Sequence, residues 1–226
     1  MNIIVSGASK GIGYEVALQA AESGHNVLAV ARNAELLDLL VAKNELITAL
    51  KVDLIEEECS QSIASWTNKV GKVEVLINNA GQLINKSFIE TTVKDFKDQF
   101  NANIITAVKL TQAVIPFMNK STHIVNISSM GGFQGSSKYS GLSAYSASKG
   151  GLSVLTECLS EELKEYGISV NALALGAVQT EMLENAFPGY SAPVSAEEMA
   201  SYILDFALKG HQFYNGQILP VAIGNP

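Results

Sequence analysis

Apolar positions along the chain form short runs that alternate with longer segments of helical spacing. The runs are rich in Val, Ile, Leu and Ala, and they cover 2–7, 25–32, 45–54, 72–81, 123–129, 168–175 and 216–224. Because most are apolar throughout rather than at every second position, they are typical of strands buried on both faces of a parallel sheet. Helical spacing marks the segments between them, at 13–24, 33–44, 56–71, 93–119, 144–167 and 195–210.

This alternation predicts one doubly wound, Rossmann-like α/β domain over residues 1–226, with a parallel sheet of about seven strands and helices on both faces. No linker, repeat or low-complexity segment interrupts the pattern. Pro116 is expected to kink or end the helix over 93–119. Ser195 with Glu198 three residues later predicts a capping box at the start of the last helix.

Charge and composition exclude several classes of function. A net charge of −7 with 15 Lys and Arg in 226 residues argues against binding to nucleic acid or an anionic membrane. No apolar run approaches the ~18 residues of a membrane span, and the first residues do not resemble a signal peptide, so we expect a cytoplasmic protein. Two distant cysteines, Cys59 and Cys158, and three scattered histidines predict neither a disulfide nor a metal site.

The turn after the first strand has the composition of a phosphate-binding loop. Gly7, Gly11 and Gly13 stand between the strand and the first helix, where glycine permits a sharp turn and a close approach of the backbone to a ligand. The free N–H groups and positive dipole end of that helix suit a pyrophosphate. The spacing G-x-x-x-G-x-G departs from the strict dinucleotide pattern G-x-G-x-x-G, so a plain tight turn stays open as an alternative.

Residues near the expected ribose favour NADP(H) over NAD(H). The second strand ends in Ala31-Arg32-Asn33 without the carboxylate that would bind a ribose 2′-OH, and Lys10 lies inside the glycine loop. Two solvated cations would look the same in the sequence. Asp53, after the third strand, is placed to accept a hydrogen bond from the adenine amino group, although an ordinary aspartate at a strand end explains it nearly as well.

Polar residues follow the fourth and fifth strands and open the helix after them. Asn78 to Gly81 follow one strand and Ser128-Ser129 end the next, at the edge where open α/β sheets bind ligands. Tyr145 and Lys149 are spaced i, i+4 and share a helix face. A phenol has an ordinary pKa of about 10, and a nearby ammonium together with a positively charged nicotinamide ring would lower it enough for proton transfer to or from a substrate oxygen. Alone, such a pair is also common on protein surfaces.

Five motifs together resemble the short-chain dehydrogenase/reductase family, in its NADP(H)-preferring type. They are SGASKGIG, NNAG, ISS, YSASK and VNALALGAVQT, in this order. The resemblance covers residue 1 to about 180, and weakly the final strand. It implies that Tyr145 is the catalytic acid/base, that Lys149 lowers the pKa of Tyr145 and binds the nicotinamide ribose, and that Ser129, rather than Ser128, orients the substrate.

The resemblance also implies roles for residues outside that group. Asn103 matches the helix asparagine that helps hold a water for proton relay, with Asn101 as the alternative, and Thr180 matches the threonine that binds the carboxamide. The residues assigned to the cofactor by the loop and the resemblance are Gly7, Ser9, Lys10, Gly11, Ile12, Gly13, Arg32, Asp53, Leu54, Asn79, Ala80, Gly81, Tyr145, Lys149, Gly176, Val178 and Thr180.

The chain departs from the family pattern at three places. Leu175 precedes Gly176 where the family usually has proline, and Ser129 and Tyr145 are 16 positions apart, about three more than is common. The extra residues predict a longer substrate loop that includes Tyr139. The segment over 180–195 is short for a substrate lid, and Met182, Leu183 and Phe187 are its candidate apolar residues.

The leading functional hypothesis is an NADP(H)-dependent oxidoreductase that acts on a small carbonyl compound or the matching alcohol. By analogy with the family, the long helices are expected to form a homodimer or homotetramer. A catalytically silent dinucleotide-binding or regulatory module is the alternative from another class. Epimerisation or dehydration on the same scaffold is a third hypothesis. The substrate itself cannot be read from the sequence.

Overall fold

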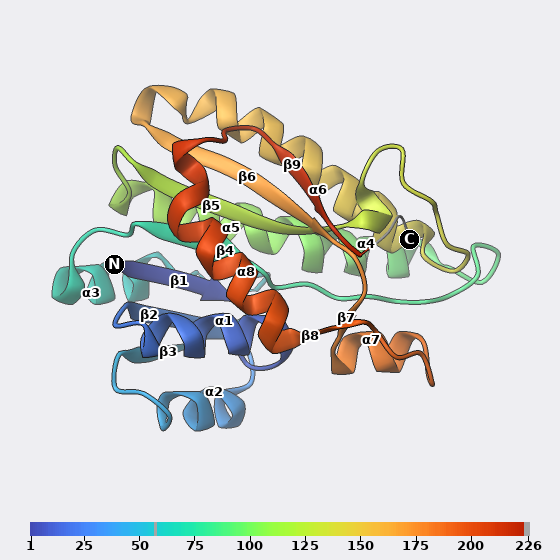
Figure 1. Ribbon diagram of the computed structural model, residues 1–226, viewed down its shortest axis with the longest axis horizontal. Helices are drawn as coiled ribbons and strands as arrows, with labels where there is room; N and C mark the ends of the chain where they lie inside the picture. Colours follow the sequence, from blue (N-terminus) through green and yellow to red (C-terminus); the bar gives the residue numbers. More distant parts are fainter. Residues whose placement is uncertain (57, 224–226) are drawn as a thin grey trace.

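Seven of the apolar segments pair into one parallel sheet in the computed structural model, which describes residues 1–56 and 58–223 (Figure 1). The strand order is β3-β2-β1-β4-β5-β6-β9, and every pairing is parallel. The strands are β1 (Asn2–Ser6), β2 (Asn26–Ala31), β3 (Ile47–Lys51), β4 (Val75–Asn78), β5 (Thr122–Ser129), β6 (Ile168–Leu175) and β9 (Ile218–Val221). The predicted Rossmann-like α/β fold is confirmed.

Helices cover both faces of the sheet because successive strand residues point to opposite sides. Ile3 and Val5 pack into one apolar cluster with residues of α1, α2 and α8, whereas Ile4 packs into another with residues of α3 and α5. Figure 1 shows α1 and α8 together on one side. The helices are α1 (Gly11–Glu22), α2 (Ala34–Val41), α3 (Ser60–Val70), α4 (Val93–Phe100), α5 (Thr106–Val114), α6 (Ser143–Glu162) and α8 (Ala196–Lys209).

The long helix predicted over 93–119 is interrupted. A π-helical turn over Asn101–Ile105 separates α4 from α5, and a 3-10 turn that contains Pro116 ends the segment. The prediction at Pro116 is therefore confirmed, while the change of helix type at Asn101–Ile105 was not foreseen. π turns often occur at functional sites.

The capping box predicted for α8 is present. The Ser195 hydroxyl accepts a hydrogen bond from the Glu198 N–H (3.1 Å), and the Glu198 carboxylate accepts one from the Ser195 N–H (2.9 Å). Both partners satisfy N–H groups that the first turn of a helix leaves free.

Three short elements between β6 and α8 escaped the sequence analysis. They are β7 (Val178–Gln179), α7 (Glu181–Ala186) and β8 (Val194–Ser195). The Thr180 hydroxyl begins α7 by accepting a hydrogen bond from the Leu183 N–H (3.2 Å). A helix of six residues carries too little periodicity to be recognised. Residue 57, in the helix predicted over 56–71, and residues 224–226, which include the end of the last predicted strand, lie outside the described residues.

The order of the strands creates a crevice at one edge of the sheet. The chain runs outward from β1 through β2 to β3 and then returns to place β4 on the other side of β1. Loops that leave the carboxyl ends of β1 and β4 therefore diverge, and such a switch point is where open α/β sheets bind ligands. None of the described helices is long and apolar enough to cross a membrane.

Candidate functional site

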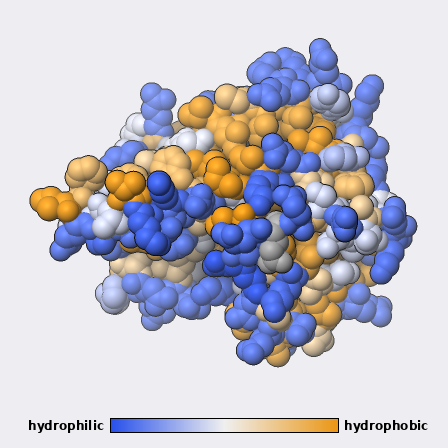
Figure 2. Space-filling view, turned by 180° about the vertical axis from the view of Figure 1, so that it is seen from behind, coloured by the Kyte–Doolittle hydropathy of each residue, from blue (hydrophilic) through white to orange (hydrophobic). Residues whose placement is uncertain are grey.

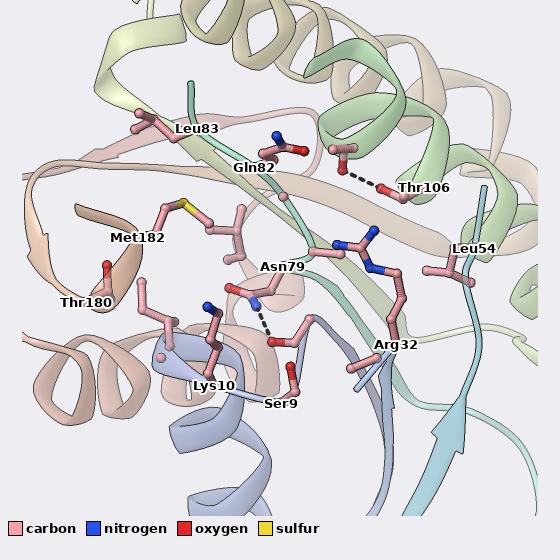
Figure 3. Close-up of a pocket in the computed structure, with 18 of the residues that line it drawn as sticks. Ser9, Lys10, Arg32, Leu54, Asn79, Gln82, Leu83, Thr106, Thr180 and Met182 are labelled. Carbon is pink, nitrogen blue, oxygen red and sulfur yellow. Dashed lines mark hydrogen bonds between the residues drawn. The ribbon is translucent and has the colours of Figure 1, made fainter. Parts of the chain in front are cut away.

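A cavity of about 710 Å³ occupies the crevice (Figure 3). In this view Thr180 and Met182 lie on one side of it and Arg32 and Leu54 on the other. The predicted site residues that line it are Gly7, Ser9, Lys10, Gly11, Ile12, Arg32, Asp53, Leu54, Asn79, Ala80, Gly81, Ser129, Tyr145, Lys149, Gly176, Val178 and Thr180. Gly13 and Asn103 are the two predicted site residues that lie behind the lining.

The glycine loop packs directly on the turn after β4. Gly7 has a φ of +67°, and a Cβ there would lie 2.9 Å from the Ala80 Cα. At Gly13 a Cβ would overlap both the Asn79 amide nitrogen and the Gly7 carbonyl oxygen. The Asn79 side chain donates hydrogen bonds to the carbonyls of Ser6 (3.0 Å) and Gly7 (3.3 Å). Glycine at both positions therefore allows Asn79 to hold the loop in place.

Asn103 holds the turn that follows β4. Its side chain is buried, accepts a hydrogen bond from the Gln82 N–H (2.8 Å), and donates to the Gln82 carbonyl (3.0 Å) and the Ser148 hydroxyl (2.8 Å). Its neighbours Asn101 and Ala102 line the cavity instead. The π turn thus directs Asn103 towards Gln82 and the preceding residues toward the cavity.

Ser129 and Tyr145 meet at one end of the cavity. The Ser129 side chain hydrogen-bonds with the Tyr145 phenol, and it also accepts from the Gly131 N–H (3.1 Å). Ser128 points into the protein, where its hydroxyl donates to the Lys149 carbonyl (3.0 Å) and lies 3.1 Å from the Ser153 hydroxyl. Of the two serines, Ser129 is therefore the one that can reach a substrate beside Tyr145.

Burial is the main cause of the pKa shifts of Tyr145 and Lys149. It raises the pKa of Tyr145, and the hydrogen bond from Ser129 opposes that shift. Burial also lowers the pKa of Lys149 to about 8, while its ammonium donates to the Ile127 carbonyl (2.7 Å). The predicted lowering of the Tyr145 pKa, which also invoked the positive charge of a nicotinamide ring, stays a prediction; among the chain's own groups, loss of hydration outweighs the interaction with Ser129.

Arg32 lies at the opposite end of the cavity from Thr180 and Met182. Arg32 follows β2, its side chain is 75% exposed, and its guanidinium lies 3.6 Å from the Asp53 carboxylate. Asn33 caps α2 by accepting from the Leu36 N–H. Lys10, another cation that lines the cleft, faces Glu181 at 2.8 Å.

The cavity fits a dinucleotide. Lys10 is the residue before α1. Its side chain makes no capping hydrogen bond to the N–H groups of the first turn of this helix. Those groups lie where Gly11 and Ile12 line the cavity, in the arrangement that binds a pyrophosphate. Arg32 at one end and Tyr145 at the other leave a continuous path for an adenosine and a nicotinamide.

Leu175 extends β6 where the family usually has proline. It is buried, pairs in register with Ser129 and Val221, and lines the cavity. The next residue, Gly176, donates its N–H to the Val221 carbonyl (2.9 Å). Two strand partners therefore hold this segment without the stiffness of a proline.

The candidate lid is only partly placed at the cavity. Met182 and Leu183 line it, whereas Phe187 and Tyr139 lie outside the lining. The longer loop before α6 is attached to the segment that follows the turn after β4, because the Lys86 N–H donates to the Gly141 carbonyl (2.9 Å).

Gln82 and Glu181 are among the cavity residues that the sequence analysis missed. Gln82 directly follows the NNAG motif, so its position beside that motif was the available signal. Glu181 looks in the sequence like an ordinary acidic residue near a helix start, and its partner is 171 positions away.

Comparison with known proteins decides the family. The family profile described as short chain dehydrogenase matches residues 1–191. This chain belongs to the short-chain dehydrogenase family. It is accordingly an oxidoreductase with a site for a nicotinamide cofactor.

Two relatives show how similar the sequence of this short-chain dehydrogenase is to those of known proteins. It is 32% identical to an oxidoreductase of Botryotinia fuckeliana, over 85% of this chain and 72% of that protein. It is 30% identical to a 3-oxoacyl-[acyl-carrier-protein] reductase of Thermotoga maritima, over 96% of this chain and 94% of that protein.

A solved structure shares the fold. The crystal structure of a short chain dehydrogenase from Burkholderia cenocepacia, in complex with NADP, superposes with a TM-score of 0.86 at 23% identity. The superposition covers 99% of this chain and 96% of that one.

Proposed function

We propose that the protein is an NADP(H)-dependent reductase of a small ketone or aldehyde, and in reverse a dehydrogenase of the alcohol. The observation that carries the proposal is the contact between Ser129 and Tyr145 beside the buried Lys149, at one end of a cleft that fits a dinucleotide. This is the group that proton transfer to a carbonyl oxygen requires.

Each residue has a distinct part in the reaction. When bound, a nicotinamide would supply hydride chemistry: a hydride to the carbonyl carbon, or its removal from the alcohol. The Ser129 hydroxyl orients the carbonyl oxygen, and Tyr145 donates its proton to that oxygen, so that the C=O bond becomes a C–OH. Because burial raises the pKa of Tyr145, the phenol is protonated at neutral pH and ready to donate. Lys149 binds the ribose and keeps a positive charge next to the phenolate that the donation leaves.

The proposed preference for NADP(H) depends on two cations and on a missing acid. Arg32 and Lys10 line the cleft, and the residues directly after β2 contain no carboxylate that would bind a ribose 2′-OH. The extra phosphate of NADP(H) suits Arg32 in particular, because this side chain is largely exposed. A fold relative crystallised with NADP agrees with this preference.

We also propose that the protein acts as a homodimer or homotetramer through α4, the π turn and α6, which pack on one another. Large apolar side chains are exposed along this region, and Figure 2 shows hydrophobic residues gathered on that side of the molecule. They are Phe88, Ile89, Val93, Phe100, Ile105 and Val154. Exposed apolar patches of this kind are characteristic of protein interfaces.

Tyr145→Phe tests the catalytic proposal. The variant keeps the aromatic ring and removes the proton donor, so turnover should fall by about 10² to 10⁴ while NADPH binding is retained. The measurement is NADPH oxidation at 340 nm with a panel of ketones, aldehydes, quinones and 3-oxoacyl thioesters, together with the Kd for NADPH. Ser128→Ala is the matched control, because this neighbouring hydroxyl is engaged by the Lys149 carbonyl and the Ser153 hydroxyl.

The same panel separates the alternatives. If the wild type binds NADPH and oxidises it with none of the compounds, the silent binding module gains support. Turnover by Tyr145→Phe at the wild-type rate would show that the phenol is not the proton donor.

A further inference from the structure

An ion pair spans the mouth of the cofactor cleft. The Lys10 ammonium lies 2.8 Å from the Glu181 carboxylate. Lys10 belongs to the glycine loop before α1, and Glu181 is the first residue of α7, so the pair joins opposite walls of the cavity that both residues line. The two side chains are 54% and 60% exposed, which leaves the pair accessible to a ligand.

The ion pair holds one end of α7, and a separate bond holds the other. Next to the pair the walls are close, because a Cβ on Gly11 would lie 3.5 Å from the Thr180 Cγ2. At the far end of α7, the Asn85 side chain donates to the Ala186 carbonyl (2.8 Å). The ion pair and the Asn85 bond therefore attach α7 to its surroundings at both ends.

In the proposed function, NADP(H) would give Lys10 a second anionic partner besides Glu181. An ammonium is a compact charge on a flexible stem, so it follows the stronger anion. NADP(H) brings a 2′-phosphate, and NAD(H) does not. We propose that Glu181 is a specificity-determining residue: its carboxylate competes with the 2′-phosphate of NADP(H) for Lys10 and thereby limits the preference for NADP(H). This inference rests on the proposed function, in which Lys10 binds that phosphate.

The expected effect is modest and selective. Exposed ion pairs contribute little to stability, so removing the competitor should lower the Kd for NADPH by about 2- to 5-fold. The Kd for NADH should stay the same, because that cofactor has no phosphate with which to displace Glu181. The effect should also disappear when Lys10 is absent.

Isothermal titration calorimetry with NADPH and NADH tests the inference on five proteins at about 50 mM salt: wild type, Glu181→Gln, Glu184→Gln, Lys10→Met and the double variant Lys10→Met/Glu181→Gln. Glu184→Gln is the matched control, since it removes the same charge from the same helix. We expect tighter NADPH binding only for Glu181→Gln, and equal Kd values for Lys10→Met and the double variant. Thermal melts followed by circular dichroism verify that each protein is folded.

Three results would overturn the inference: unchanged or weaker NADPH binding by Glu181→Gln, the same gain in Glu184→Gln, or a gain that persists without Lys10. The Lys10→Met protein separates this failure from failure of the proposed function. If Lys10→Met leaves the NADPH-to-NADH ratio unchanged, the proposed role of Lys10 is itself wrong. If that ratio falls but Glu181→Gln shows no gain that depends on Lys10, only the role of Glu181 is wrong.

Discussion

His123 is buried in the centre of the sheet, and its hydrogen bonds suit only the neutral ring. Its Nδ1 lies 3.0 Å from the Ala207 carbonyl, which can only accept, so Nδ1 carries the hydrogen. Its Nε2 is then the acceptor for the Asn171 amide (2.9 Å). Burial lowers the pKa of His123 to about 4, and the neighbouring His211 adds to the shift.

Acid should destabilise the protein through His123. The folded-state pKa of about 4 lies below the ordinary value of 6.5, so the unfolded chain takes up this proton first. The resulting stability is present above pH 6.5 and is lost as the pH falls towards 4, by about 3 kcal/mol. The measurement is urea unfolding at several pH values. The free energy of unfolding of His123→Gln should lack the part of the decrease between pH 6.5 and 4 that His123 causes.

His25→Gln provides the comparison, because His25 is only partly buried. It should retain most of the pH dependence of the wild type. An identical acid response in His123→Gln and the wild type would contradict the assignment.

At the scale of elements, two helices next to the site differ in whether they have room for a side chain in place of a glycine. α1 approaches the turn after β4 so closely that a Cβ at Gly13 has no room. In α6 a Cβ at Gly150 would meet only the Gly132 carbonyl, at 3.5 Å, which is ordinary contact. The first helix is therefore restricted by tertiary packing, and the second is free to follow helix propensity.

The same substitution should have opposite effects in the two helices. Gly13→Ala should lower the free energy of unfolding by about 1–3 kcal/mol, because Asn79 and Gly7 must move. Gly150→Ala should raise it by about 0.5–1 kcal/mol, since alanine is the better helix former. Urea denaturation measures both, and equal effects of the two variants would refute the packing argument at Gly13.

At the scale of the whole molecule, the large exposed apolar side chains of α4, the π turn and α6 do not line the cofactor cavity. Val154, on α6, is 58% exposed. A charge at the centre of an apolar interface is costly because it must lose its hydration. A charged residue introduced in this region should therefore disfavour the oligomer relative to the monomer.

Size-exclusion chromatography with light scattering checks the assembly. The wild type should elute as a dimer or tetramer, and Val154→Glu should shift it to the monomer. Leu39→Glu is the control, because Leu39 is equally exposed, at 61%, on α2. A monomeric wild type, or dissociation by Leu39→Glu as well, would refute this interface.

Local patterns were enough to predict most of the fold. The strand predicted over 168–175 has those bounds in the structure, and the Ser195–Glu198 capping box lies where it was expected. Patterns of this kind depend on neighbouring residues. The six-residue α7 and the π turn at Asn101–Ile105 were missed because their formation depends on packing.

The sequence by itself determined where strands and helices alternate along the chain, where the glycine loop lies and which residue types the site contains. These features depend on burial patterns and turn chemistry, which act over short stretches of chain. Only the tertiary structure decided that Asn103 lies behind the cavity lining and that Lys10 meets Glu181. It also decided that burial raises the pKa of Tyr145. Contacts and dehydration between distant segments depend on how the sheet and helices come together, and no local pattern records them.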